Sequence, residues 1–167
     1  MMGGFVIVPM QASDWPTVQR IYAEGIATGN ATFETAVTAD WATWDAGKRP
    51  DCRLVAKSGD DVLGWAALSP ISKRAVYAGV AEVSVYVGDD ARGQGVGKAL
   101  LQALVLASEE AGVWTLMASI FPENEASVAI HQQCGFRLLG RRHHIAQHHG
   151  IWRDTVILER RSQVVGV

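Results

Sequence analysis

Cysteine is scarce in this sequence. The chain has two in 167 residues, Cys52 and Cys134, and they lie far apart. Two distant thiols do not make the disulfide framework of a small secreted domain, whereas reduced thiols are usual in cytosolic proteins. We therefore expect both side chains to be free and to pack in the core.

An excess of charge and long apolar runs are also lacking. Fifteen Lys and Arg residues stand against seventeen Asp and Glu, so no net positive field exists to hold a nucleic-acid backbone. No apolar run reaches the roughly 20 residues of a membrane span, and Met1–Met10 has no basic leader. We expect a cytoplasmic protein with neither a nucleic-acid nor a membrane partner.

What the sequence does contain is the composition of a folded domain. Hydrophobic residues make up 49% of the chain and charged residues 19%, the balance of a globular protein. A domain of this length buries about 70% of the surface of its unfolded chain, which is enough for a substantial core. Because the sequence shows no repeat, linker or low-complexity tract, we expect residues 1–167 to form one domain.

Apolar spacing and turn residues predict both helices and strands. The expected helices follow the caps Ser13-Asp14 and Asp40, lie within Gly93–Gly112, and span Glu125–Cys134. The expected strands are Phe5–Pro9, Cys52–Lys57, Val62–Leu68, Val80–Val87, Trp114–Phe121, Phe136–Arg142 and Ile151–Glu159. This order, with its hairpin signals, indicates an α+β domain with a mostly antiparallel sheet.

The strand Val80–Val87 alternates in character. Its two faces carry Val83, Val85 and Val87 on one side, and Glu82, Ser84 and Tyr86 on the other. One face is therefore expected to pack in the core, and the other to serve chemistry or solvent.

A glycine-rich segment, Arg92–Lys98, follows this strand and opens the long helix. Glycines let main-chain N–H groups approach a ligand closely, and a helix N-terminus is partly positive, so the turn suits a diphosphate. A Walker phosphate loop is excluded because Ala99 follows Lys98 and Arg92 takes the first glycine position. The glycine spacing and the preceding hairpin signals also disfavour a dinucleotide fold, which leaves a flexible loop as the alternative.

This segment resembles the Arg/Gln-x-x-Gly-x-Gly/Ala pyrophosphate loop of the GNAT acetyltransferases. Three further segments are similar to that superfamily in the same order, namely Glu82–Val87, Pro122–Ser127 and Gly135-Phe136. The resemblance spans about residues 5–160, and four ordered motifs are far more specific than one. It implies the GNAT fold, a mostly antiparallel central sheet flanked by helices, with acetyl-CoA as co-substrate and no metal.

The resemblance also implies a set of cofactor contacts. The main chain of Val85–Val87 would pair with the pantetheine arm, and one of its N–H groups would polarise the thioester carbonyl. Asn124 matches an asparagine that bonds the same arm, although a cap for the next helix is an equally natural role. The implied cofactor-binding residues are Val85, Tyr86, Val87, Arg92, Gly93, Gln94, Gly95, Val96, Gly97, Lys98, Asn124 and Ser127.

Glu82 is the candidate catalytic base. An amine acceptor is mostly ammonium near neutral pH, and a partly desolvated carboxylate on a central strand could take its proton. The alternative is an ordinary surface carboxylate. Many members of the superfamily carry a tyrosine in the helix before Gly-Phe to protonate the leaving thiolate, and here that helix offers His131. The identity of a general acid therefore stays open, and the implied reaction is a direct transfer.

Three shorter segments resemble the phosphinothricin and methionine sulfoximine acetyltransferase branch. They are Thr32-Phe33-Glu34, Arg74-Ala75-x-Tyr77 and Gly150-x-Trp152-x-Asp154. The branch implies a small-molecule amine acceptor, the α-amino group of an amino-acid-like compound. Its carboxylate would be held by Lys73 and Arg74. The pocket would be shaped by Phe33, Glu34, Tyr77 and Trp152. Solvated loop charges and core aromatics are the alternatives.

The histidines between the last two expected strands invite a metal interpretation. They are His143, His144, His148 and His149, and no nearby Cys or acidic cluster completes a site. We expect a solvated or dimer-facing loop, and the branch resemblance implies a homodimer, the commonest oligomer. Two other functions stay open, an N-acetyltransferase of protein N-termini or other amines, and a non-catalytic acetyl-CoA sensor.

Overall fold

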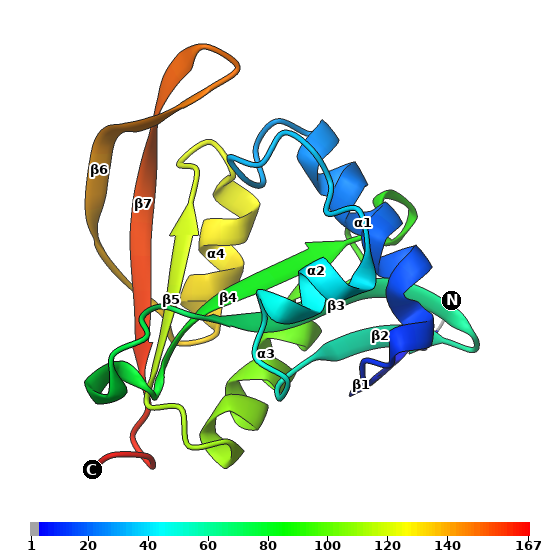
Figure 1. Cartoon of the computed structure of the whole chain (residues 1–167), viewed down its shortest axis with the longest axis horizontal. Coiled ribbons are helices and arrows are strands. Elements are labelled where there is room, and N and C mark those ends of the chain that lie inside the picture. Colours follow the sequence, from blue (N-terminus) through cyan, green and yellow to red (C-terminus); the bar gives the residue numbers. More distant parts are fainter. Residues whose placement is uncertain (1–3) are drawn as a thin grey trace.

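The computed structural model describes residues 4–167 (Figure 1). Residues 1–3, where the segment assessed for a leader begins, lie outside the described part. Seven strands of the described chain form one sheet in the order β1-β2-β3-β4-β5-β7-β6, and only the β4–β5 pair is parallel. The strands are β1 Val6–Pro9, β2 Leu54–Ser58, β3 Asp61–Pro70, β4 Val80–Val87, β5 Thr115–Ile120, β6 Arg137–His148 and β7 Ile151–Arg161. The expected α+β class with a mostly antiparallel sheet is confirmed.

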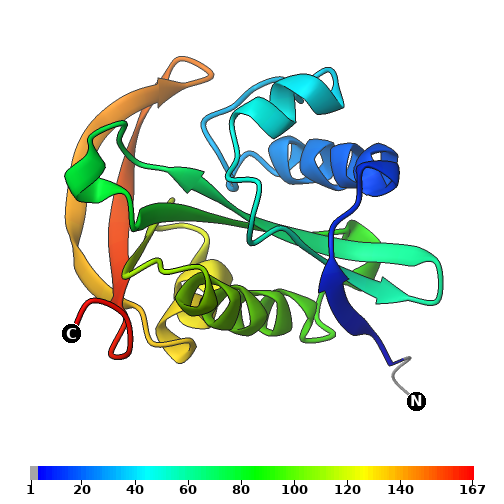
Figure 2. The ribbon, with the colours of Figure 1, turned by 60° about the horizontal axis from the view of Figure 1, so that its bottom comes forward.

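Helices cover both faces of the sheet. Figure 2 shows α1 and α2 on one face and α3 and α4 on the other. The helices are α1 Trp15–Ala27, α2 Trp41–Ala46, α3 Val96–Glu110 and α4 Glu125–Gln133. Short 3-10 turns span Ala12–Asp14, Ala75–Tyr77 and Asp89–Ala91. Among residues 4–167, none of these helices has the length and apolar content to cross a membrane.

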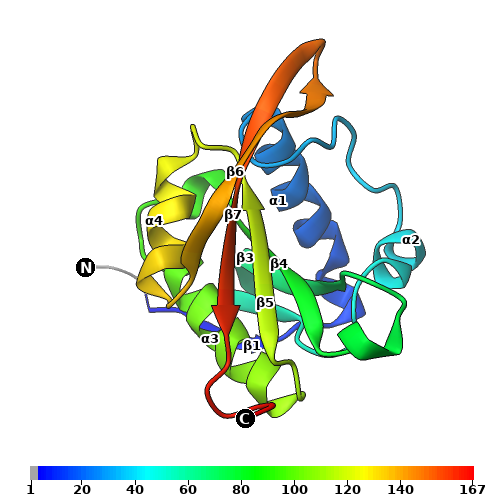
Figure 3. The ribbon, with the colours of Figure 1, turned by 90° about the vertical axis from the view of Figure 1, so that its left-hand side faces the viewer.

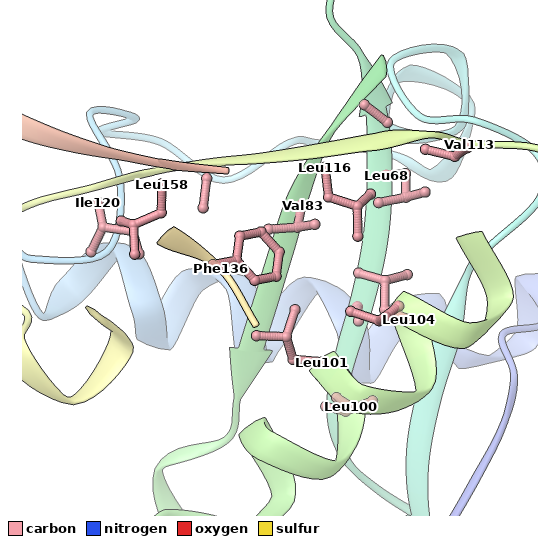
Figure 4. Packing of buried hydrophobic residues seen from close by; sticks show 14 of the residues in the cluster. Leu68, Val83, Leu100, Leu101, Leu104, Val113, Leu116, Ile120, Phe136 and Leu158 are labelled. Atoms are coloured by element: carbon pink, nitrogen blue, oxygen red, sulfur yellow. The ribbon is translucent and has the colours of Figure 1, made fainter. Parts of the chain in front are cut away.

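Each face of the sheet has its own core. The apolar stripe of α3 places Leu100, Leu101 and Leu104 against strand residues such as Leu68 and Leu116 (Figure 4). Alternation along the strands then directs the neighbouring side chains to the other face. There they pack with α1 and α2 in an aromatic-rich cluster that includes Trp15, Ile21, Trp44, Val55 and Trp65. Both faces of the central strands are therefore anchored, which fixes the β4 register.

The alternation expected in β4 is present, with one refinement. Val83, Val85 and Val87 pack against the core beneath α3. On the other face, the Tyr86 ring stacks on Trp65 with centroids 4.9 Å apart, so this position belongs to the second core. Of the three residues expected on that face, Glu82 and Ser84 remain outside the core and line a cavity.

The expectation of a loop at the histidine-rich segment is wrong. β6 runs through His143 and His144 to His148, which pairs with Ile151 of β7 in a long hairpin. The register shifts between Arg142 and Ala146, and His144 has a φ of 46°. A bulge in an exposed edge strand rich in Arg and His breaks the alternation by which sequence patterns reveal strands.

Candidate active site

The central sheet opens between β4 and β5. Their parallel pairing covers Val80–Glu82 and Thr115–Met117, yet β4 continues to Val87 and β5 to Ile120. Figure 1 shows the two strands diverging beyond these pairs. We call this divergence the fork. Because β5 has left β4, the N–H and C=O groups on that edge of β4 face a space instead of a neighbouring strand.

Two cavities lie in the fork. The first has a volume of about 310 Å³ and is lined by Phe33, Glu82, Ser84, Phe121 and Thr155, among others. The second has a volume of about 460 Å³ and is lined by residues that include Val87, Arg92, Gly97, Ala126 and Ile130. They share the wall residues Ala31, Val85, Tyr86, Asn124, Ser127 and His131. The cavities are therefore two ends of one cleft that meet at the middle of β4.

The glycine-rich turn lies beside the second cavity. Gly93 and Gly95 have φ values of 76° and 82°, which favour glycine, and a Cβ added at either would meet open space. Gly95 is also the N-cap of α3, so the first-turn N–H groups point out of the helix at this end. Such an open cradle of main-chain donors fits the diphosphate of coenzyme A. Arg92 lines the second cavity, and its guanidinium is 2.7 Å from Asp89.

Asn124 lies at the shared wall. Its Oδ1 accepts a hydrogen bond from the Ser127 main-chain N–H at 3.3 Å, which caps α4. Its Nδ2 donates to the Asn30 carbonyl at 3.2 Å. The capping role considered for this residue is thus present, and a contact to the cofactor arm stays a prediction.

Glu82 lies where the strands separate. Its β3 partner is Ser69, whose Oγ is 3.1 Å from the Lys48 Nζ. Glu82 lines the first cavity and is exposed, with its carboxylate partly desolvated. This desolvation raises the pKa of Glu82, while the positive charges of Lys48 and Arg142 partly oppose the rise. A carboxylate in this setting is suited to accept a proton near neutral pH.

His131 projects from α4 into the region shared by both cavities. Its side chain is buried, and the Nδ1 atom is 2.7 Å from the Ser127 carbonyl oxygen. A carbonyl only accepts, so Nδ1 carries a proton and Nε2 of the neutral ring bears a lone pair. Burial lowers the pKa of His131, although the Ser127 bond opposes this, so the neutral form is favoured. In that form Nε2 accepts a hydrogen bond and does not donate one.

The acceptor residues expected from sequence are only partly gathered. Phe33 lines the first cavity and packs edge-on against Phe121 at 4.8 Å. Glu34 follows it in the same loop. Burial is the main cause of the raised pKa of Tyr22, and the negative charge of Glu34 raises it further. Both residues come from the segment between α1 and α2, far from β4 in sequence.

Like Glu34, the remaining expected acceptor residues line neither of the two cavities of the described chain. Lys73, Arg74 and Tyr77 are exposed in the connection between β3 and β4, where the Arg74 guanidinium lies 5.5 Å from the Tyr77 ring. Trp152 is 55% exposed near the tip of the β6–β7 hairpin. Their roles in acceptor binding stay predictions, and a closing loop or a second subunit would be needed to fulfil them.

Several residues near the first cavity were missed by sequence reasoning. Lys48 reaches Ser69 from the segment after α2, and Arg142 and Thr155 are register partners in the β6–β7 hairpin. No local motif marks them, because the sheet register brings Arg142 and Thr155 to the fork and the loop after α2 brings Lys48. Within residues 4–167, His, Cys, Asp and Glu side chains form no group of three that could hold a metal ion.

Comparison with known proteins identifies relatives of this chain. The profile of the acetyltransferase (GNAT) family matches residues 15–136. Phosphinothricin N-acetyltransferase of Alcaligenes faecalis is 36% identical over 158 residues, covering 88% of this chain and 77% of that protein. L-methionine sulfoximine/L-methionine sulfone acetyltransferase of Pseudomonas paraeruginosa is 32% identical, covering 88% of each chain.

A solved structure extends the agreement to the fold. The GNAT superfamily phosphinothricin acetyltransferase of Sinorhizobium meliloti, in complex with AcCoA, matches with a TM-score of 0.88 and 29% identity. The match covers 99% of this chain and 91% of that one. The chain therefore belongs to the acetyltransferase (GNAT) family, whose members transfer an acetyl group to an amine.

Proposed function

We propose that this protein transfers the acetyl group of acetyl-CoA directly to the α-amino group of a small amino-acid-like acceptor of the phosphinothricin or methionine sulfoximine type. The observation that carries the proposal is the cleft itself. Its second cavity adjoins the glycine-rich turn, its first adjoins Glu82, and both meet at Val85 and Tyr86. The printed names of the relatives support the acceptor class.

The donor end of the cleft uses main-chain groups. N–H groups of Gly93–Lys98 would bind the diphosphate, and the free edge of Val85–Val87 would hydrogen-bond the pantetheine arm. A β4 N–H directed into the fork would polarise the thioester carbonyl and stabilise the oxyanion as it forms. Coenzyme A supplies the activated thioester. The protein supplies its position next to the acceptor, which accounts for much of the rate.

The acceptor end of the cleft manages one proton. An amine whose pKa lies two units above the pH costs about 2.7 kcal/mol to deprotonate. Glu82 would take this proton, after which the nitrogen lone pair attacks the thioester carbon. The C–S bond then breaks, and the nitrogen releases its second proton to water as the amide forms. His131 commits its Nδ1 proton to Ser127, so we propose that coenzyme A leaves as a thiolate without a dedicated acid.

The experiment measures thiol release and product mass with acetyl-CoA and a panel of acceptors. The panel contains methionine sulfoximine, its decarboxylated amine, phosphinothricin and a peptide with a free N-terminus. We expect kcat/KM for methionine sulfoximine to exceed that for the decarboxylated amine by about 10²-fold. The decarboxylated amine lacks the carboxylate, so the cationic side chain expected to bind that group would be left unpaired. The Arg74→Ala variant should lose most of this preference.

Each rival function has its own outcome in this panel. Equal efficiency with the two amines would overturn the amino-acid proposal, and transfer to the peptide alone would favour an N-terminal acetyltransferase. Binding of acetyl-CoA without turnover of any acceptor would favour the sensor.

We also propose that the single domain assembles as a homodimer through the β6–β7 hairpin. Figure 3 shows this hairpin extending beyond the rest of the molecule. Its tip exposes Ile145, Ile151 and Trp152, which form the type of apolar surface that partners cover. Light scattering at micromolar concentration should give twice the monomer mass of 18.0 kDa. A monomer at that concentration would contradict the proposal.

A further inference from the structure

The segment between α1 and α2 forms one side of the cleft without regular secondary structure. Asn30 and Ala31 line the second cavity, and Ala31, Thr32 and Phe33 line the first. Gln19 of α1 donates hydrogen bonds to its far end, at the Thr38 and Ala39 carbonyls, whereas the bonds within its first half are short-range, such as Asn30 N–H to the Thr28 hydroxyl at 3.1 Å. Bonds of this type shape a turn but do not fix where it lies across the fork.

Arg153 of β7 joins this segment to the opposite side of the cleft. Its guanidinium donates to the Gly29 carbonyl, to Asn30 Oδ1 at 2.8 Å and to Glu123 Oε2 at 3.2 Å. It also lies 3.6 Å from the centroid of the Phe121 ring. We call Arg153 with these four partners the Arg153 network. One rigid, planar guanidinium thus holds two chain segments that are far apart in sequence.

The network spans the open end of the fork. Glu123 and Phe121 belong to the connection between β5 and α4, whereas Gly29 and Asn30 follow α1. The Asn124 bond to the Asn30 carbonyl and the packing of Phe33 on Phe121 connect the same two segments. Their contacts are weaker, since one is a neutral hydrogen bond and the other an aromatic pair.

Arg153 is itself largely covered and does not line either cavity of the described chain. Its side chain is 14% exposed, and Nη1 lies 3.3 Å from Nδ1 of the buried His148 ring. Because a guanidinium only donates, His148 Nδ1 accepts here and the ring is neutral. This ring packs against Phe33 and Phe121, at 6.1 and 5.8 Å between centroids. His148 therefore supports both the segment that carries Phe33 and the segment that carries Phe121.

We propose that Arg153 is a positioning residue that holds residues 29–33 across the fork and thereby sets the affinity of the cleft for both substrates. Without the network, the segment is in place for only a fraction of the time, and each apparent dissociation constant rises by the inverse of that fraction. The chemical step is unchanged, because Glu82 and the β4 edge do not depend on Arg153. The acceptor half of this inference rests on the proposed function, and the acetyl-CoA half does not.

The test compares Arg153→Met with Arg160→Met. Methionine keeps an apolar stem of similar length on Phe121 but donates no hydrogen bonds. Arg160 lies on the same strand and is also partly buried, but its ion pair is with Glu109 of α3, at 3.5 Å. We expect Arg153→Met to raise the acetyl-CoA Kd and the acceptor KM about tenfold each, with kcat within about threefold. Arg160→Met should leave all three close to the parent values.

Two further measurements separate positioning from mere stability. Arg153→Lys keeps the charge but not the planar array of N–H donors. Its acetyl-CoA Kd and acceptor KM should therefore lie between those of the parent and Arg153→Met. Amide hydrogen exchange at residues 30–33 should be faster in Arg153→Met and unchanged in Arg160→Met. If Arg153→Met does not fold, Arg153→Lys provides the same readouts.

The inference is overturned if kcat falls while Kd and KM hold, or if exchange at residues 30–33 is unchanged. It is also overturned if Arg160→Met has the same effect as Arg153→Met. If the parent acetylates no amino acid, the proposed function fails, yet the acetyl-CoA Kd and the exchange rates still decide the role of Arg153.

Discussion

The two ends of the cleft are built in different ways. The donor end takes its main features from short continuous segments, the glycine-rich turn Arg92–Lys98 and the start of α4 at Asn124–Ser127. The acceptor end takes Phe33, Glu82 and Thr155 from three separate elements. Under the proposed function, local main-chain geometry would bind the shared cofactor, and side chains from separate segments would bind a particular acceptor.

This difference explains how one fold can keep a donor and change its acceptor. Main-chain donors at a helix start are available whatever side chains surround them, so substitutions elsewhere leave them in place. The acceptor end instead depends on individual side chains such as Lys48 and Arg142, which influence Glu82 from other elements. Variants at the two ends should therefore separate donor affinity from acceptor turnover.

The largest effect is expected at the acceptor end, in Glu82→Gln. Glutamine keeps the shape of the side chain but cannot accept the proton, so kcat should fall about 10²- to 10⁴-fold while acetyl-CoA affinity stays close to that of the parent. Steady-state kinetics and a binding titration give the two quantities. Glu110→Gln, at the end of α3, is the control and should match the parent in both.

The pH dependence of the same variant tests the role of Glu82 directly. The pKa of Glu82 is raised by desolvation, so the parent should lose activity as the pH falls through a value above the ordinary one of 4.5. The base works only in its deprotonated form, which gives this acidic limb its sign. Glu82→Gln should lack the limb. An unchanged pH profile in the variant would move the base to another group.

A smaller effect is expected at the donor end, in Gly95→Asp. Gly95 has a φ of 82° and faces open space, so an aspartate there is strained and adds a negative charge beside the diphosphate. Acetyl-CoA affinity should fall about 10²-fold, because like charges in contact cost several kcal/mol. The parent should gain about 2.7 kcal/mol of stability at a hundredfold excess of acetyl-CoA over its Kd, and the variant almost none.

The chain offers a matched control for this substitution. Gly112, just past the other end of α3, has a φ of 81° and equally open surroundings. Gly112→Asp suffers the same backbone strain without approaching the cradle, so it should lose stability but keep its response to acetyl-CoA. If both variants respond to acetyl-CoA alike, the glycine-rich turn is not the diphosphate site.

The same contrast decides what could be predicted from sequence. The glycine-rich turn and the alternation of β4 are local patterns. The fold class followed from the order of the expected helices and strands, and the family resemblance from four ordered motifs that include these two segments. The fork could not be predicted, because β4 and β5 look like ordinary strands until their pairing stops at Glu82 and Met117. Arg153 and Lys48 carry no motif, and their partners lie in distant segments.

The His-rich segment of the β6–β7 hairpin was the hardest part of the fold to predict from the sequence. Residues 143–149 were interpreted as a polar loop, since an exposed edge strand needs no apolar face. The bulge at His144 shifts the alternation, which removes the remaining signal. His148 was grouped with solvated or dimer-facing histidines, yet it is buried against Phe33 and Phe121, which come from two distant segments.

The smallest effect is expected in Asp154→Asn, which tests whether the bulged part of this hairpin, unlike Arg153, supports the acceptor end alone. Asp154 accepts hydrogen bonds from the Arg141 Nε at 2.7 Å and from the His144 main-chain N–H at 2.8 Å, next to the bulge. The His144 bond and the contact with Arg141 lower the pKa of Asp154 to about 2. A lowered pKa means that the carboxylate stabilises the fold above its ordinary pKa of 3.8, and that this contribution is lost as the pH falls toward about 2. The Tm of Asp154→Asn should therefore lie below that of the parent at pH 7, and the two should converge near pH 2.

The acceptor KM of Asp154→Asn should rise about two- to threefold, with acetyl-CoA affinity unchanged. Thr155 and Arg142 belong to the hairpin and shift when it shifts, whereas the glycine-rich turn is not part of it. Asp60→Asn, in the turn between β2 and β3, serves as the control. A Tm difference that persists unchanged at pH 2, or an equal loss of affinity for both substrates, would show that the hairpin does not act on the acceptor end through Asp154.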